Sequence, residues 1–184
     1  MKQILDTVEK TMNKVLDNLD ANLRTIRTGR ANPALFADIE IDYYGAPTPL
    51  QQLASFQTPE ARTILVTPYD KGTLTDIETA LRNSDIGANP ANDGNVIRVV
   101  LPDLTEERRK EYVKIVKGKA EDGKVSIRNI RRHAKETLER IKKDGEAGED
   151  EVTRSISELD DLTKSKVESV DKLLAQKEAE LLEV

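Results

Sequence analysis

Cysteine and tryptophan are absent from the 184 residues, histidine occurs once, and aromatic residues make up only 3% of the chain. Without cysteine there are no disulfides and no thiolate chemistry, which fits a reducing cytoplasm. A single histidine leaves metal cages and histidine-based triads without their parts. A core with so few rings must consist mainly of leucine, isoleucine, valine and alanine, which favours packing of helix on helix.

Long apolar runs and phosphate-binding glycine motifs are also missing. No run approaches the roughly 20 residues of a membrane span, and the N-terminal segment has Asp6 and Glu9 between its apolar residues, unlike a signal or transit peptide. Neither GxxxxGK[ST] nor GxGxxG occurs. The acidic clusters 149–151 and 160–161 lie on a strongly polar helix, where solvation explains them without catalysis. We expect a cytoplasmic protein with no catalytic residue, cofactor, metal or membrane contact.

Three long segments have apolar residues at helical spacing. The first runs from Leu5 to Ile26 and is expected to end near Thr28, because Gly29 interrupts the pattern and Pro33 cannot continue it. The second opens at Thr105, a good N-cap followed by acidic residues, and continues to residue 143. Gly123 is a weak point within it, costing about 1 kcal/mol relative to alanine.

The third segment follows the turn 144–150 and runs from Val152 to Leu181. Each of the three segments has a single apolar face, so none is stable alone. Their simplest mutual burial is an antiparallel three-helix bundle.

Between the first and second helices the apolar period changes. Residues alternate from Ala37 to Tyr43 as in a half-buried strand, and Gly45, Pro47 and Pro49 mark turns. Further strands are expected at Gln52–Phe56, Thr63–Val66 and Val96–Leu101, a helix at Thr73–Asn83, and a loop at Gly87–Gly94.

The predicted fold class is therefore two-domain α+β. A bundle of residues 1–30 and 105–184 holds an inserted β/α/β domain, residues 31–104. The chain crosses between the domains twice, so we expect a hinge formed by two short segments: Arg30, Ala31, Asn32 and Pro33, and Pro102, Asp103, Leu104 and Thr105.

Charge is distributed unevenly along the chain. The net charge is −5 overall, but residues 107–143 sum to +8 and residues 144–184 to −8. At 100° per residue, ten cations of the second long helix share an arc of about 120° beside its apolar stripe. We call these ten residues the cationic arc: Lys110, Lys114, Lys117, Lys124, Arg128, Arg131, Arg132, Lys135, Lys142 and Lys143.

Two interpretations of the cationic arc remain open. Its side chains could solubilise the helix and pair with the acidic third helix, or they could bind a polyanion. Only Glu121 and Glu139 interrupt the arc, and its arginines suit bidentate phosphate contact, which favours the second interpretation. With few aromatics for base stacking, the expected ligand is the backbone and shape of structured RNA. Arg131 is expected to be mostly exposed, and His133 is interpreted as a solvated helix residue.

Several ordered motifs resemble ribosome recycling factors. They are Ile26-Arg27-Thr28-Gly29-Arg30-Ala31-Asn32-Pro33, Tyr43-Tyr44-Gly45-Ala46-Pro47-Thr48-Pro49-Leu50, Leu104-Thr105-Glu106-Glu107-Arg108-Arg109-Lys110 and Val125-Ser126-Ile127-Arg128-Asn129-Ile130-Arg131-Arg132. The resemblance implies an L-shaped molecule similar in outline to transfer RNA, with a hinged α/β domain. It also implies a monomeric, non-enzymatic factor that binds large-subunit ribosomal RNA at the intersubunit face of the post-termination ribosome. Together with EF-G and GTP, such a factor separates the subunits and releases them from messenger RNA.

The resemblance also implies which residues contact ribosomal RNA. Arg131 matches the family's most function-critical arginine, and the expected RNA-binding set is Arg27, Arg30, Arg109, Lys117, Arg128, Arg131 and Arg132. From spacing alone, Arg27 and Arg30 could instead cap the first helix. A helical scaffold that binds proteins is the alternative function. It explains the apolar stripes but gives no reason for the single cationic arc or for the inserted domain.

Overall fold

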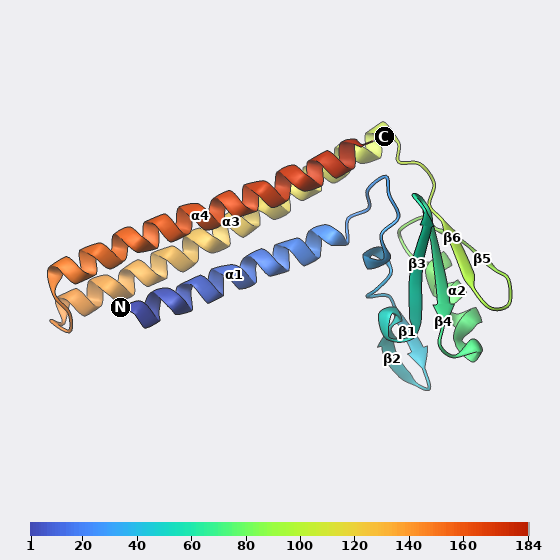
Figure 1. Cartoon of the computed structure of the whole chain (residues 1–184), viewed down its shortest axis with the longest axis horizontal. Helices are drawn as coiled ribbons and strands as arrows, with labels where there is room; N and C mark the ends of the chain where they lie inside the picture. The colour runs from blue at the N-terminus through green and yellow to red at the C-terminus, as the bar shows by residue number, and fades with distance from the viewer. Residues whose placement is uncertain (184) are drawn as a thin grey trace. The chain divides into compact units, whose positions relative to one another are not determined.

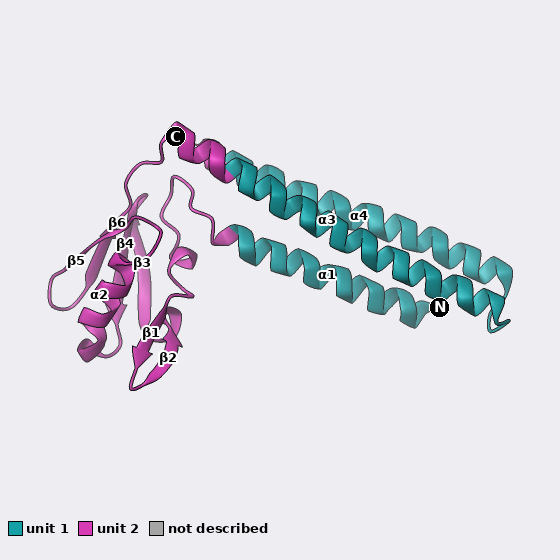
Figure 2. Cartoon of the chain, turned by 180° about the vertical axis from the view of Figure 1, so that it is seen from behind, with its two compact units in different colours: residues 1–23, 113–179 teal, residues 24–112, 180–184 magenta. Residues whose placement is uncertain are grey.

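A computed structural model describes residues 1–183 and contains four α-helices. They are α1 (Lys2–Arg24), α2 (Leu74–Arg82), α3 (Glu106–Lys143) and α4 (Glu149–Leu182). The chain divides into two compact units, coloured separately in Figure 2. The first comprises Met1–Leu23 and Val113–Ala179, and the second comprises Arg24–Tyr112 and Glu180–Val184.

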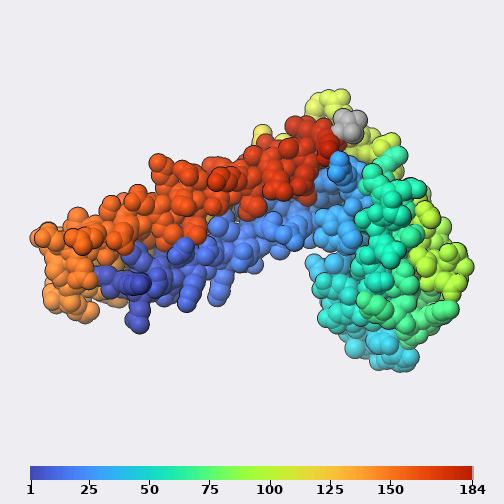
Figure 3. Space-filling model, viewed as in Figure 1, coloured from blue at the N-terminus to red at the C-terminus, as the bar shows by residue number. Residues whose placement is uncertain are grey.

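The first unit is a bundle in which α1, α3 and α4 lie side by side along most of their length (Figure 1). Space-filling atoms of α1 and α4 cover the side of the bundle that faces the viewer in Figure 3. Its core is aliphatic, as the composition predicts. Fully or almost fully buried members are Val8, Met12, Leu19, Leu23, Val116, Ala120, Ile127, Ala134, Leu138, Val152, Leu159 and Val170.

The ends of the long helices follow the capping signals only in part. Thr105 is confirmed as the N-cap of α3, because its hydroxyl accepts a hydrogen bond from the Arg108 amide at 3.2 Å. The apolar period predicts a first helix that continues to Thr28, whereas α1 ends at Arg24. Ile26 is nevertheless buried, so it extends the apolar pattern from a non-helical segment.

Gly123, the weak point predicted in the second long helix, does not interrupt α3. It is buried in α3, which continues through it without a break. A Cβ at this position would lie 3.4 Å from Leu19 Cδ2 of α1 and 4.0 Å from Val170 Cγ2 of α4. These are ordinary van der Waals distances, so the packing around Gly123 has room for an alanine side chain.

Gly118 stands in open space on α3, where a Cβ would meet no atom within 4 Å. Gly118→Ala is expected to raise the free energy of unfolding by about 0.5–1 kcal/mol, because alanine loses less backbone entropy in a helix. Thermal unfolding followed by helical circular dichroism measures the change. Gly145→Ala is the matched control and should destabilise, since Gly145 has φ +71° in the turn between α3 and α4. A lower melting temperature for Gly118→Ala would contradict the prediction.

The second unit contains two antiparallel sheets. A hairpin joins β1 (Glu40–Tyr43) to β2 (Ala46–Pro49), and a four-stranded sheet has the order β3-β4-β6-β5. The bounds of its strands are β3 (Ala54–Glu60), β4 (Thr63–Pro68), β5 (Asn89–Asn92) and β6 (Ile97–Val100). Helix α2 packs against β5 and β1. The core between these elements includes Phe36, Leu50, Ile64, Val66, Ile77, Leu81, Ile97 and Val99.

Two strands differ from the sequence-based prediction. The turn residues Pro47 and Pro49 lie within β2, and the loop predicted at Gly87–Gly94 contains β5. Proline lacks an amide donor, which restricts it to strands with an unpaired edge. Within residues 1–183, β2 pairs only with β1 and β5 only with β6, so both are edge strands that accept prolines.

Among residues 1–183 the structure has no helix that is long and apolar enough to cross a membrane.

Candidate nucleic-acid interface

The orientation of α3 follows from its buried stripe, which includes Val116, Ile127 and Leu138. Burial of this stripe against α1 and α4 fixes the rotation of the helix about its axis. The cationic arc lies directly beside the stripe, so one of its edges borders a neighbouring helix and the other faces solvent. The two edges therefore have different electrostatic surroundings.

The edge beside the stripe is paired with the acidic helix α4. Lys124 Nζ lies 2.5 Å from an Asp171 carboxylate oxygen, and Lys117 Nζ lies 3.6 Å from Glu178 Oε1. Lys142 pairs with Glu149 at the end of the bundle. These contacts support part of the first interpretation, in which the arc is neutralised internally by the third long helix.

Arg131 belongs to the same paired edge. Its Nε donates to Asp160 Oδ1 of α4 at 2.6 Å, and its side chain is only 37% exposed. The expectation of a mostly exposed Arg131 is thus corrected, because the stripe turns this position toward α4. The ion pair uses Nε, so the guanidinium is held in a fixed orientation with its Nη groups available as further donors.

The solvent edge of the arc is less neutralised. Arg128 pairs within α3 with Glu121 at 3.5 Å, and Lys135 pairs with Glu139 at 3.7 Å. For Lys114, Arg132 and Lys143 the described part of the chain provides no ion pair. Exposed pairs within one helix contribute little stability and are readily exchanged for another anion. This edge can therefore bind phosphate without breaking the bundle.

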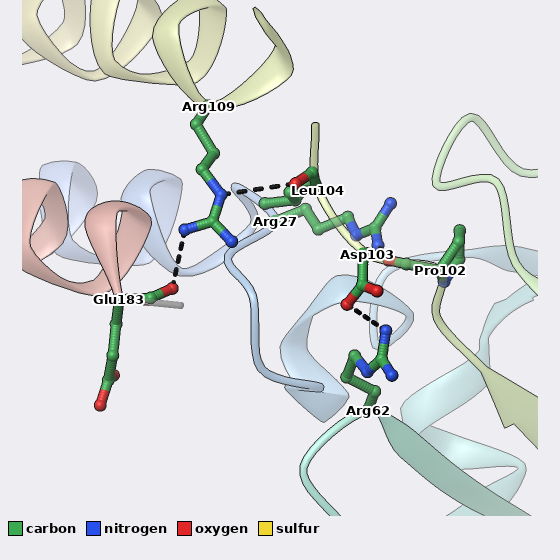
Figure 4. A network of polar contacts seen from close by, with 7 residues as sticks. All are labelled: Arg27, Arg62, Pro102, Asp103, Leu104, Arg109 and Glu183. Carbon is green, nitrogen blue, oxygen red and sulfur yellow. Dashed lines mark hydrogen bonds and ion pairs between the residues drawn. The ribbon is translucent and has the colours of Figure 1, made fainter. Parts of the chain in front are cut away.

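Arg27, Arg30 and Arg109 bind other parts of the chain itself, and Figure 4 draws Arg27 and Arg109 with their partners. Arg109 of α3 donates from Nη1 to the carbonyl oxygen of Glu183 at 2.9 Å and to that of Leu181 at 3.4 Å. It thereby satisfies carbonyls at the C-terminal end of α4, where a cation also matches the helix dipole.

Arg27 and Arg30, which follow α1 in the chain, make similar internal contacts. Arg27 donates from Nη2 to the carbonyl oxygen of Pro102, and partial burial lowers the pKa of its guanidinium. Arg30 Nη2 lies 2.9 Å from Glu183 Oε1. Both residues lie beyond the end of α1. They contact Pro102 and Glu183, next to the end of α4, and do not cap α1.

Two further residues of this group of polar contacts, Arg62 and Glu183, were not identified from the sequence. Arg62 pairs with Asp103, as Figure 4 shows, and Glu183 accepts hydrogen bonds from two arginines. Neither residue belongs to a periodic pattern, because their partners lie far away in the sequence. The His133 side chain is 72% exposed, and its Nδ1 lies 3.6 Å from Glu136 Oε2 on the same helix.

A long bundle with a partly neutralised cationic helix and a small sheet-containing unit defines a class: a two-domain α+β protein with a surface suited to polyanions. A family model for the ribosome recycling factor matches residues 19–182. The chain is 63% identical to the ribosome-recycling factor of Kocuria rhizophila over 182 residues, which cover 99% of this chain and 98% of that protein. It is 62% identical to the corresponding protein of Renibacterium salmoninarum over 184 residues, the whole of both chains.

Solved structures agree with this match. A solution structure of the ribosome recycling factor has a TM-score of 0.78 at 37% identity and covers 100% of this chain and 97% of its own. A second structure contains models of the T. thermophilus ribosome recycling factor and the E. coli elongation factor G bound to the E. coli post-termination complex. It matches with a TM-score of 0.70 and 42% identity over 99% of this chain and 98% of that chain.

The chain belongs to the ribosome recycling factor family. The predicted family resemblance and the two-domain α+β fold class are therefore confirmed.

Proposed function

We propose that the chain is a non-enzymatic factor that binds the post-termination ribosome in the cytoplasm. With EF-G and its GTP, the factor separates the subunits. Family membership supports this function, as does the related factor bound with elongation factor G to a post-termination complex. The energy for separation would come from the nucleotide of EF-G, which leaves this chain the tasks of binding and of transmitting force.

The observation that carries the RNA-binding part of the proposal is the asymmetry of the cationic arc. Ion pairs to α4 hold its inner edge in place, while Arg128, Arg132 and Lys114 extend along the edge that faces solvent. A row of cations on one helix, some held by ion pairs to α4 and others exposed to solvent, suits the regularly spaced phosphates of folded RNA. Lys117, Arg128, Arg131 and Arg132 are the proposed ribosomal RNA contacts.

Arg27, Arg30 and Arg109 have a different proposed role. Their hydrogen bonds to Pro102, Glu183 and Leu181 connect the two linkers to the ends of α3 and α4. We propose that they define the resting geometry of a hinge at residues 30–33 and 102–105. They would contact ribosomal RNA only through the donors that these bonds leave free.

Binding to isolated large ribosomal subunits tests the RNA-binding part. Co-sedimentation across a salt series should show log K falling linearly with log salt, with a slope of about −3 to −4 if about four phosphates are contacted. A splitting assay with 70S ribosomes, EF-G and GTP tests the functional part. Binding that is absent at low salt, or independent of salt, would contradict the proposal.

The alternative helical scaffold makes the opposite prediction. A scaffold with an internally neutralised arc should capture proteins and show no preference for ribosomal subunits. The ion pairs of the arc with Asp160, Asp171 and Glu178 favour this alternative in part, but they leave the solvent edge of the arc unexplained.

A further inference from the structure

The chain contains three Asp-Gly pairs: Asp93-Gly94, Asp122-Gly123 and Asp144-Gly145. In such a pair the glycine amide nitrogen can attack the aspartate side-chain carboxyl carbon and close a succinimide ring, because glycine has no Cβ to hinder the approach. The proposed function uses none of these pairs. Their local structures differ, so the fold decides which of them can react.

Asp93 lies in the turn between β5 and β6, where hydrogen bonds hold both reacting groups. Its Oδ1 accepts from the Asn95 amide at 3.0 Å and from the Val96 amide at 2.8 Å. These two bonds lower the pKa of the Asp93 carboxyl and keep it ionised. The Gly94 amide donates to Asn92 Oδ1 at 2.6 Å. Ring closure would require the carboxylate to leave its two amides and Gly94 to give up its acceptor, so Asp93 is protected.

Asp122 is protected by the helix that contains it. Gly123 is buried inside α3, where its amide belongs to the helical ladder of hydrogen bonds. The Asp122 carboxyl carbon can reach this nitrogen only if the helix unwinds locally. This part of α3 packs against Leu19 of α1 and Val170 of α4, so unwinding would also open the core of the bundle.

Asp144 has neither protection. It directly follows α3, in the exposed turn that leads to α4 (Figure 1). The Gly145 amide donates to the Lys142 carbonyl at 3.2 Å and the Glu146 amide to the Ile141 carbonyl at 3.1 Å, the two bonds of a helix end with a left-handed glycine. Helix ends open at low cost. In the described part of the chain no hydrogen bond or ion pair holds the Asp144 carboxylate away from the Gly145 nitrogen.

We propose that Asp144 is a site of spontaneous isomerisation, at which aspartate is converted to isoaspartate. The Gly145 nitrogen bonds to Asp144 Cγ, and its proton leaves with the carboxyl hydroxyl as water. Water then opens the ring at one of its two carbonyls. Cleavage of the new Cγ–N bond restores aspartate, whereas cleavage of the former peptide bond leaves the chain running through Cγ. One water is lost and one is gained, so the mass is unchanged and no cofactor takes part.

The isoaspartyl linkage changes the turn in two ways. It adds a methylene group to the backbone, and it leaves a free α-carboxylate, the group that a repair methyltransferase esterifies. The extra carbon displaces the amides of Gly145 and Glu146 from the last carbonyls of α3, so the end of this helix loses its two capping bonds. The isolated isoaspartyl form should therefore melt about 2–4 °C below the parent.

Prolonged incubation of the full chain in a mildly acidic buffer tests the proposal, since the neutral carboxyl loses its hydroxyl more readily than the ionised one. Peptides are separated after digestion and fragmented in a mass spectrometer, which distinguishes the two linkages of equal mass. Isoaspartate should form at Asp144 at least about tenfold faster than at Asp93 or Asp122, because those positions must first open. A rate at Asp93 or Asp122 that equals or exceeds the rate at Asp144 overturns the proposal.

Two controls separate the role of the fold from that of the dipeptide. Asp144→Glu keeps the charge but requires a larger ring, so methyl transfer from S-adenosylmethionine by an isoaspartate methyltransferase should fall to background. Persistent methyl transfer to this variant would place the reaction elsewhere and overturn the assignment. In denaturant the three pairs should react at similar rates, because their different surroundings are then removed. If Asp144 stays fastest in denaturant, its sequence neighbours cause the reactivity, and the structural explanation is overturned.

Discussion

Arg131→Glu is expected to weaken binding to the large ribosomal subunit by at least about tenfold, equivalent to about 1.4 kcal/mol. The substitution removes an oriented cation and places a carboxylate next to Asp160, the present partner of Arg131. The salt dependence of binding should also become shallower by about one, because one phosphate contact is lost. Co-sedimentation of both proteins across a salt series measures the affinity and the slope together.

A charge swap distinguishes an RNA contact from a structural ion pair. In the double variant Arg131→Asp with Asp160→Arg, the pair between α3 and α4 is restored with reversed polarity. If Arg131 contacts RNA, the swap should recover the melting temperature but not ribosome binding. Recovery of binding would show that the residue acts only by holding the helices together. Lys164→Glu, at an exposed position of α4 outside the arc, is the control for a general loss of positive charge.

Bridging the proposed hinge is expected to reduce ribosome splitting by about tenfold or more while leaving binding within about twofold. Thr58 and Glu180 line one hollow together with Arg30 and Pro33. The chain has no cysteine, so Thr58→Cys and Glu180→Cys introduce a unique thiol pair that a short bifunctional maleimide can join. A bridge across residues 30–33 would remove the motion that we propose to follow docking, and it leaves the cationic arc unchanged.

Each single-cysteine variant, treated with the same reagent, controls for modification without bridging. Binding is measured by co-sedimentation with 70S ribosomes, and splitting by light scattering with EF-G and GTP. Equal loss of binding and splitting in the bridged protein would argue against a hinge. Full splitting by the bridged protein would do the same.

Local pattern identified the helices well, because helical burial repeats within a few residues. Most residues of the stripe from Leu5 to Leu23 and of the α3 stripe are buried, whereas Leu5, Val15 and Ile130 are only half-buried. The strand β5 was missed because Asn89-Pro90-Ala91-Asn92 has the composition of a turn. It becomes a strand only by pairing with β6 and packing against α2, and its own residues do not predict these partners.

In the candidate site, too, one part could be predicted from local pattern and another part depends on tertiary packing. The arc of ten cations follows from the sequence and the helical angle alone. Which members are paired depends on the rotation and register of α4, which bring Asp160, Asp171 and Glu178 to the inner edge. Arg109 is an example of a contact that the sequence could not predict. Its motif suggests RNA contact, whereas its guanidinium donates hydrogen bonds to the carbonyl oxygens of Leu181 and Glu183.

The sequence by itself determined the helices, the inserted sheet-containing segment, the cationic arc and the family. Each of these depends on residues that are close together along the chain or on motifs that can be matched directly. Only the tertiary structure decided the exposure of Arg131, the polar contacts of Arg27, Arg62 and Glu183, and the positive φ of Tyr44 in the turn between β1 and β2. The packing of the elements decides which distant segments form ion pairs and which backbone angles strand pairing fixes. A linear pattern of apolar and charged residues does not specify that packing.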